Sequence, residues 1–239
     1  MVRNHFASDD NNISLNSHLD LIATLPVNYA MVLYPAFQAI DVFGPLDILN
    51  TLSLTYPINL FIVGPTLDPI PTKHDMPNAF ASNTSELIVP THTFDNPPEN
   101  IDVLMVPGGM GTRDNATLDQ VSAFIAETFP RVDYLFTVCT GAAAAAKAGV
   151  LDGKRATTNK RAWAFATAFG PKVEWVTHAR WVEDGKVWTT SGVAAGIDGM
   201  FAFISAIYGD DVSDRLAIGA EYERHLNSTN DPFADIYGL

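Results

Sequence analysis

Short apolar runs alternate along the chain with stretches of helical periodicity, and this alternation constrains the fold more than any other feature. The apolar runs are near-continuous, which is typical of strands that are buried on both faces. Strands that alternate with helices form a parallel sheet through right-handed crossovers, with helices on both sides. The expected strands are Tyr29–Tyr34, Asn59–Val63, Val103–Val106 and Tyr134–Val138, and the expected helices are Val42–Leu52, Leu118–Phe129, Ala142–Gly149 and Ala162–Phe169.

Residues 173–190 depart from this alternation. They read as antiparallel strands, with Glu183-Asp184-Gly185 as a tight turn. Two helices are expected to follow, at Ala195–Tyr208 and Asp211–Leu226. The predicted fold class is therefore α/β: a mostly parallel, flavodoxin-like sheet sandwiched by helices, with a small antiparallel hairpin annex. The strands expected in this segment are Val173–His178, Arg180–Val182 and Lys186–Thr190.

The length of 239 residues allows one domain with a full core. Residues 1–24 are polar and are predicted to be an extension, whereas residues 25–239 are predicted to form a single domain whose last residues, 221–239, look like an irregular tail. The extension has no apolar secretion segment, and its acidic residues fit poorly with a mitochondrial presequence, so we expect a cytoplasmic location. The lone cysteine, Cys139, is compatible with a reducing compartment.

Charge and composition exclude several classes of protein. The 14 basic residues against 27 acidic ones give a net charge of −13, which argues against a nucleic-acid partner. No apolar run approaches the ~18 residues of a membrane span. No histidine pair has metal-ligand spacing, so we expect neither a metal nor another cofactor. The basic cluster that contains Lys160 is interpreted as a solvated rim.

Cys139 lies where a buried strand turns into a helix, which is the position of a nucleophile elbow. Gly141 and the small residues after it permit close contacts at such a turn. A helix N-terminus favours thiolate over thiol, and the thiolate is the reactive form. A buried, inert cysteine is the alternative, but the end of a strand beside the start of a helix favours a reactive thiol.

Two further segments lie at the ends of expected strands, where ligands bind in open parallel sheets. The glycines of Pro107-Gly108-Gly109-Met110-Gly111 can direct backbone N–H groups at a developing negative charge, although a phosphate cradle is an equally simple interpretation of these residues alone. Asp41, at the start of a helix in apolar surroundings, is either an N-cap or a buried proton donor beside the thiol. The sequence leaves both interpretations of Asp41 open.

Taken together and in this order, these segments resemble the ThiJ/PfpI superfamily, which has the class I glutamine amidotransferase-like fold. The resemblance covers residues 28–233, and it implies an enzyme that acts on a small molecule as a homodimer, the commonest symmetric assembly. The motifs that carry it are Asp41 before Gly44-Pro45, Pro107-Gly108-Gly109, the Cys139 turn, Lys154-Arg155-Ala156-Thr157-Thr158, Arg180-Trp181-Val182-Glu183-Asp184-Gly185 and Gly196-Ile197-Asp198.

Cys139-Thr140-Gly141 together with an aspartate at position 41 is similar to the isonitrile hydratase branch. The resemblance implies that Cys139 attacks the isonitrile carbon to form a thioimidate, and that Asp41 moves the protons until an N-substituted formamide is released. It also implies an anion pocket formed by the Gly109 N–H and by Thr140, and a supporting role for Asp198. Asp198 would equally be expected as an acidic residue in the first turn of a helix.

Asn159 stands where many superfamily members have a histidine, which argues against amidotransfer and proteolysis. Two alternatives to the hydratase remain: a glyoxalase or deglycase acting on reactive carbonyls, and a non-catalytic protein in which Cys139 senses oxidants. The superfamily's regulators carry an additional helix-turn-helix domain, and the sequence to Leu239 contains none, so a DNA-binding regulator is not expected.

Overall fold

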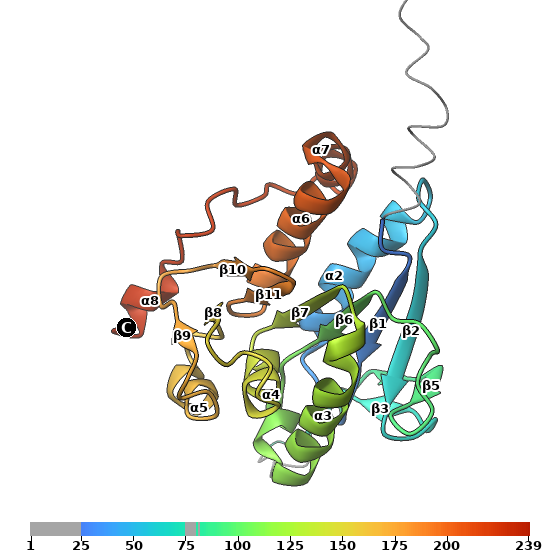
Figure 1. Cartoon of the computed structure of the whole chain (residues 1–239), viewed down its shortest axis with the longest axis vertical. Helices are drawn as coiled ribbons and strands as arrows, with labels where there is room; N and C mark the ends of the chain where they lie inside the picture. Colours follow the sequence, from blue (N-terminus) through green and yellow to red (C-terminus); the bar gives the residue numbers. More distant parts are fainter. Residues whose placement is uncertain (1–24, 75–79, 81) are drawn as a thin grey trace, which may run out of the picture.

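The computed structural model describes residues 25–74, 80 and 82–239, so the predicted extension 1–24 lies outside the described residues. A seven-stranded sheet in the order β10-β11-β7-β6-β1-β2-β5 forms its centre (Figure 1). Neighbouring strands are parallel except at the β10–β11 edge, and the predicted fold class is confirmed. The strands of this sheet are β1 (Asn28–Val32), β2 (Asn59–Gly64), β5 (His92–Thr93), β6 (Val103–Val106), β7 (Tyr134–Val138), β10 (Trp181–Asp184) and β11 (Val187–Thr190).

Helices cover both faces of the sheet. Helices α2, α6 and α7 pack together on one face, and α3 packs beside α4 on the other (Figure 1). The short helix α5 contacts α4. The helices are α2 (Ala39–Leu52), α3 (Asn115–Thr128), α4 (Gly141–Lys147), α5 (Trp163–Thr167), α6 (Ala195–Tyr208), α7 (Asp210–Gly219) and α8 (Phe233–Ile236), with 3-10 turns η1 (Met110–Arg113) and η2 (Phe129–Arg131).

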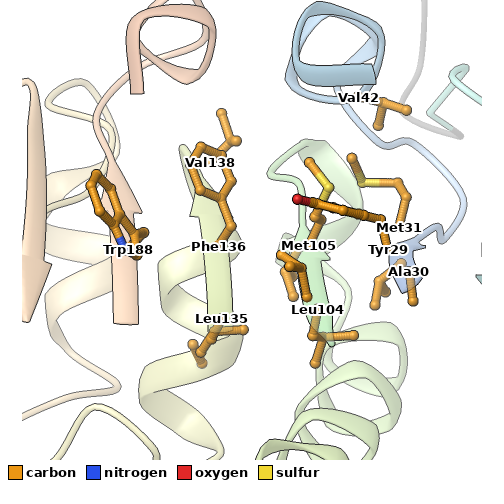
Figure 2. Close-up of a cluster of buried hydrophobic side chains, with 14 of the residues drawn as sticks. Tyr29, Ala30, Met31, Val42, Leu104, Met105, Leu135, Phe136, Val138 and Trp188 are labelled. Atoms are coloured by element: carbon orange, nitrogen blue, oxygen red, sulfur yellow. The ribbon is translucent and has the colours of Figure 1, made fainter. Parts of the chain in front are cut away.

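The central strands are apolar on both faces because both faces are covered. Leu104 pairs with Leu135 across β6 and β7, and these two side chains point to the α3 and α4 side (Figure 2). Met105 and Phe136, one residue further along each strand, point to the opposite face. All four are fully buried, which accounts for the continuous apolar runs in the sequence.

The predicted hairpin is present, but it is continuous with the central sheet. β11 pairs in parallel with β7, and β10 forms the antiparallel edge. The expectation for Val173–His178 is wrong: its short strand β9 (Glu174–Trp175) pairs in parallel with β8 (Arg155–Ala156), away from the hairpin. A second small sheet joins β3 (Ile70–Pro71) and β4 (Leu87–Ile88) in antiparallel fashion.

The C-terminal segment differs from the prediction in two ways. The helix expected to reach Leu226 ends at Gly219, and the chain turns at Glu221, whose φ of 50° is left-handed. Residues 220–232 then return toward β9, and α8 lies beside it (Figure 1). The tail is thus packed against the domain, and the Asp231 side chain within it is buried. None of the described helices is both long and apolar enough to span a membrane.

Candidate active site

Cys139 occupies a strained turn between β7 and α4, as the elbow prediction requires. Its φ is +56°, a left-handed conformation that a non-glycine residue adopts only where the surroundings hold it. The Cys139 N–H donates to Ser191 O at 3.0 Å, and Thr158 Oγ1 donates to Cys139 O at 2.9 Å. Gly141 is required because a Cβ there would lie 2.3 Å from Val106 O.

The Cys139 side chain lies at the floor of a cavity of about 650 Å³ and is 6% exposed. Burial, followed by the charge of Asp41, raises the thiol pKa well above its usual value. The Thr140 N–H, the Asn159 side chain and the Thr140 hydroxyl lower it, but they do not outweigh burial. The expectation that the helix N-terminus alone favours a thiolate is therefore wrong, because desolvation of the sulfur is the larger effect.

Asp41 is fully buried beside Cys139, in the first turn of α2. Its Oδ2 accepts the Gly108 N–H at 2.9 Å, and its Oδ1 accepts no hydrogen bond from the described part of the chain. Burial raises the pKa of this carboxyl to about 7, while the Gly108 N–H and the Cys139 side chain lower it. Gln38 occupies the N-cap of α2, so the interpretation of Asp41 as a cap is wrong.

The glycine turn after β6 packs directly on the elbow. A Cβ on Gly108 would lie 2.5 Å from the Thr140 backbone nitrogen, and Gly109 has a φ of +146° that favours glycine. The Gly109 N–H donates to Thr140 Oγ1 at 3.1 Å, and Thr112 Oγ1 donates to the same oxygen at 3.1 Å. Gly109 and Thr140 both line the cavity, as expected, but this N–H is engaged by the Thr140 hydroxyl.

Asp198 does not join the other predicted residues. It is buried on α6, where its Oδ2 accepts a hydrogen bond from Arg180 Nε at 2.7 Å. Its Oδ1 accepts the Tyr222 hydroxyl and the His225 N–H, each at 3.0 Å. The cavity around Cys139 is lined by Arg180 and not by Asp198. The carboxylate therefore holds the arginine in place and does not contact the thiol.

Asn159 replaces the histidine of related proteins and contacts the thiol itself. Its Oδ1 accepts the Ala162 N–H at 2.9 Å, which fixes the amide so that its nitrogen faces Gly192 and Cys139. No histidine is among the cavity-lining residues that the structure describes. Within those residues there is likewise no group of three or more metal-ligating side chains.

Lys160 is buried, so the prediction of a solvated rim is wrong at this position. Its Nζ donates to Thr157 Oγ1 at 2.7 Å and lies 3.5 Å from Asp231 Oδ2. Ser191 Oγ donates to the same carboxylate at 2.5 Å. Burial lowers the Lys160 pKa to about 8, although the charge of Asp231 raises it. The C-terminal segment is thus anchored at the site, and sequence analysis missed this contribution.

The cavity wall combines the elbow with several other segments. The glycine turn and η1 form one side, the start of α6 another, and α8 a third. The lining residues are Gln38, Gly109, Met110, Arg113, Cys139, Thr140, Asn159, Lys160, Arg161, Ala162, Arg180, Ser191, Gly192, Val193, Ala194, Phe233 and Tyr237.

Comparison with known proteins gives consistent matches to this fold. A family model described as the DJ-1/PfpI family matches residues 28–207. An isonitrile hydratase from Pseudomonas putida is 30% identical over 198 residues, which cover 83% of this chain and 79% of that protein. The transcriptional regulator GbdR from Pseudomonas aeruginosa is 30% identical over 140 residues, which cover 59% of this chain and 37% of the regulator.

Solved structures show the same arrangement. A ThiJ/PfpI family protein from Pseudomonas syringae superposes with a TM-score of 0.68 at 27% identity, covering 92% of this chain and 83% of that one. DJ-1beta from Drosophila melanogaster has a TM-score of 0.66 at 15% identity, covering 83% and 100% respectively. At that identity the second likeness concerns the fold alone.

Proposed function

The chain belongs to the DJ-1/PfpI family, and we propose that it is a cysteine-dependent isonitrile hydratase, which converts an isonitrile into an N-substituted formamide. The observation that carries the proposal is the buried Asp41–Cys139 pair at the floor of a cavity without histidine among its described lining residues. Adding a thiol to an isonitrile requires one nucleophile and one proton, and this pair supplies both. The similarity to an isonitrile hydratase supports the same assignment.

In the first step, the Cys139 sulfur adds to the terminal isonitrile carbon, and the proton held by the Asp41–Cys139 pair goes to the same carbon. One C–S bond and one C–H bond form, and the C–N triple bond becomes the double bond of a thioimidate. Asp41 is left as a carboxylate. The raised pKa of this carboxyl suits a group that must give up and regain a proton near neutral pH.

In the second step, Asp41 takes a proton from water as the water oxygen adds to the thioimidate carbon. The C–S bond breaks, the nitrogen receives the proton of the added hydroxyl, and the formamide departs. Cys139 and Asp41 again hold one proton between them. The Thr140 hydroxyl, held by the Gly109 N–H, is placed to donate to the charge that develops on the substrate.

The direct test is turnover of an aryl isonitrile, followed by the appearance of the formamide, with methylglyoxal and lactate as the parallel assay. We expect formamide and no lactate. Lactate without formamide would replace the hydratase with a glyoxalase. The raised thiol pKa argues against an oxidant sensor, because sensor cysteines react as thiolates of low pKa.

Asp41→Asn is expected to lower kcat/KM about 10²- to 10⁴-fold, the usual contribution of a general acid-base. In the unmodified enzyme, both groups of the pair are protonated below pH 7. Loss of one proton at about pH 7 gives the active form, and the thiol proton is lost only at higher pH. The rate should therefore rise with pH through about 7 and then stay level. The variant should lack this inflection.

Asp47→Asn is the matched control, since Asp47 is exposed on the same helix, α2. It should keep the wild-type rate and pH profile. An Asp41→Asn enzyme with an unaltered rate and pH profile would remove Asp41 from the chemistry.

We also propose a cytoplasmic homodimer. Ile40 and Phe43 on α2 are 48% and 41% exposed, and such apolar side chains suit an interface between two copies. Light scattering after size exclusion measures the assembly directly.

A further inference from the structure

The cavity around Cys139 has a charge opposite to that of the chain. The sequence has 14 basic residues and 27 acidic ones. The cavity is nevertheless lined by Arg113, Lys160, Arg161 and Arg180, and no acidic side chain is among its described lining residues. A concave site with one sign of charge attracts ligands of the opposite sign.

Two of these four cations are already neutralised by buried carboxylates. Lys160 Nζ lies 3.5 Å from Asp231, and Arg180 forms an ion pair of 2.6 Å with Asp198. Both carboxylates are fully buried. These two cations therefore belong to the framework of the site and leave no charge free for a ligand.

Arg113 and Arg161 are different, because neither forms an ion pair with any residue in the described part of the chain. The Arg113 guanidinium lies 3.6 Å from the centre of the Phe165 ring, a contact that fixes its position. Burial lowers the Arg113 pKa and the charge of Cys139 raises it, so this arginine lies within electrostatic range of the sulfur. The site therefore keeps two unneutralised guanidinium groups.

The remaining wall is suited to an organic body. Met110, Val193, Phe233 and Tyr237 contribute apolar and aromatic surface. The volume of about 650 Å³ lies within the ~300–1,000 Å³ of small-molecule sites. A ligand that fills it would contact Cys139 at the floor and the two arginines at the exposed rim.

We propose, on the basis of the hydratase function above, that the substrate is an isonitrile whose organic group carries a carboxylate, and that Arg113 and Arg161 bind this carboxylate while the isonitrile carbon faces Cys139. A guanidinium binds a carboxylate through two parallel hydrogen bonds, which gives orientation as well as affinity. The carboxylate thus selects the substrate, and the Asp41–Cys139 pair transforms it.

The test compares 4-isocyanobenzoate with its methyl ester, which has the same ring and no charge. The measured quantity is the ratio of the two kcat/KM values, because a change in this ratio between variants is independent of intrinsic reactivity. We expect Arg113→Gln/Arg161→Gln to lower the ratio about 10- to 100-fold, the effect of losing hydrogen bonds to a charged group. Each single variant should lower it in part, and Arg113→Lys should lower it less than Arg113→Gln.

Arg215→Gln is the matched control, since Arg215 is an exposed arginine on α7 outside the cavity. It should leave the ratio unchanged. A ratio that is the same in the double variant and the wild type would overturn the proposal. Because Arg161→Gln alters an exposed side chain, it provides the same comparison if the double variant folds poorly.

A binding experiment separates this proposal from the proposed reaction. Calorimetry with 4-formamidobenzoate and its methyl ester needs no turnover. Weaker binding of the acid alone by the double variant would support the carboxylate site even if neither isonitrile reacted, in which case only the hydratase function would fail. Equal affinities for the acid in both proteins would overturn the carboxylate site whatever the enzyme does with isonitriles.

Discussion

Cys139→Ser is expected to reduce formamide production by about 10³-fold or more, the scale seen when an enzyme loses its covalent nucleophile. A serine hydroxyl is far less acidic than a thiol, and Asp41 with a pKa of about 7 is too weak a base to ionise it. Steady-state turnover measures the loss. Rapid quenching and intact-mass measurement should find the isonitrile adduct on the wild type and none on the variant.

The variant must be compared with the wild type for fold as well as for rate, because Cys139 is buried and has a positive φ. Circular dichroism and 4-formamidobenzoate binding report whether the site survives the substitution. Lost turnover with an unchanged fold would also argue against a pure oxidant sensor. Turnover that persists in the folded variant would remove the covalent mechanism.

Much of the fold could be predicted because several elements have only one plausible partner layer. The strands at Val103–Val106 and Tyr134–Val138 and the helix at Ala195–Tyr208 have the predicted bounds. Strands covered on both faces leave continuous apolar runs, which the sequence displays directly. Val173–His178 was mispredicted because its pairing depends on distant contacts, such as the hydrogen bond from Glu174 N–H to Lys154 O.

The position of the candidate site was predictable for a topological reason. The carboxyl ends of parallel strands meet at one edge of a sheet, so Asp41, Gly109 and Cys139 converge although they are distant in sequence. The contribution of Asp231 could not be predicted, because lysine and aspartate are rarely buried and their pairing depends on how the tail folds back. The thiol pKa was mispredicted because the helix N-terminus is a local feature, whereas desolvation depends on the assembled cavity.

The buried Lys160–Asp231 pair gives the largest expected effect on stability. Asp231→Asn leaves the Lys160 ammonium without its counter-ion in a place where both side chains are almost fully buried. Removing one partner of such a pair destabilises a protein by about 3–5 kcal/mol. We expect a loss of about 3 kcal/mol in the free energy of unfolding at pH 6, measured by urea denaturation at fixed protein concentration. Turnover should fall as well, because Asp231 anchors the tail that carries Phe233 and Tyr237.

The pH dependence of this loss follows from Lys160. Burial holds its pKa at about 8, below the usual value, and Asp231 raises it. Without Asp231 the pKa falls further, so the folded variant releases a proton that the unfolded chain keeps. The stability of the variant therefore rises with pH over a window where the wild type does not yet change. The difference between the two proteins should shrink as pH rises from 6 to about 8 and stay constant above it.

Two variants test whether burial of the charge is the cause. Asp235→Asn removes an exposed carboxylate from the neighbouring helix α8, and it should alter stability by no more than about 0.5 kcal/mol. Lys160→Met/Asp231→Leu removes both charges and should recover much of the loss, since apolar side chains of similar size replace buried ion pairs with little cost. If Asp231→Asn were no less stable than Asp235→Asn, the tail would not be anchored by this pair, and the cavity wall formed by α8 would have to be held in another way.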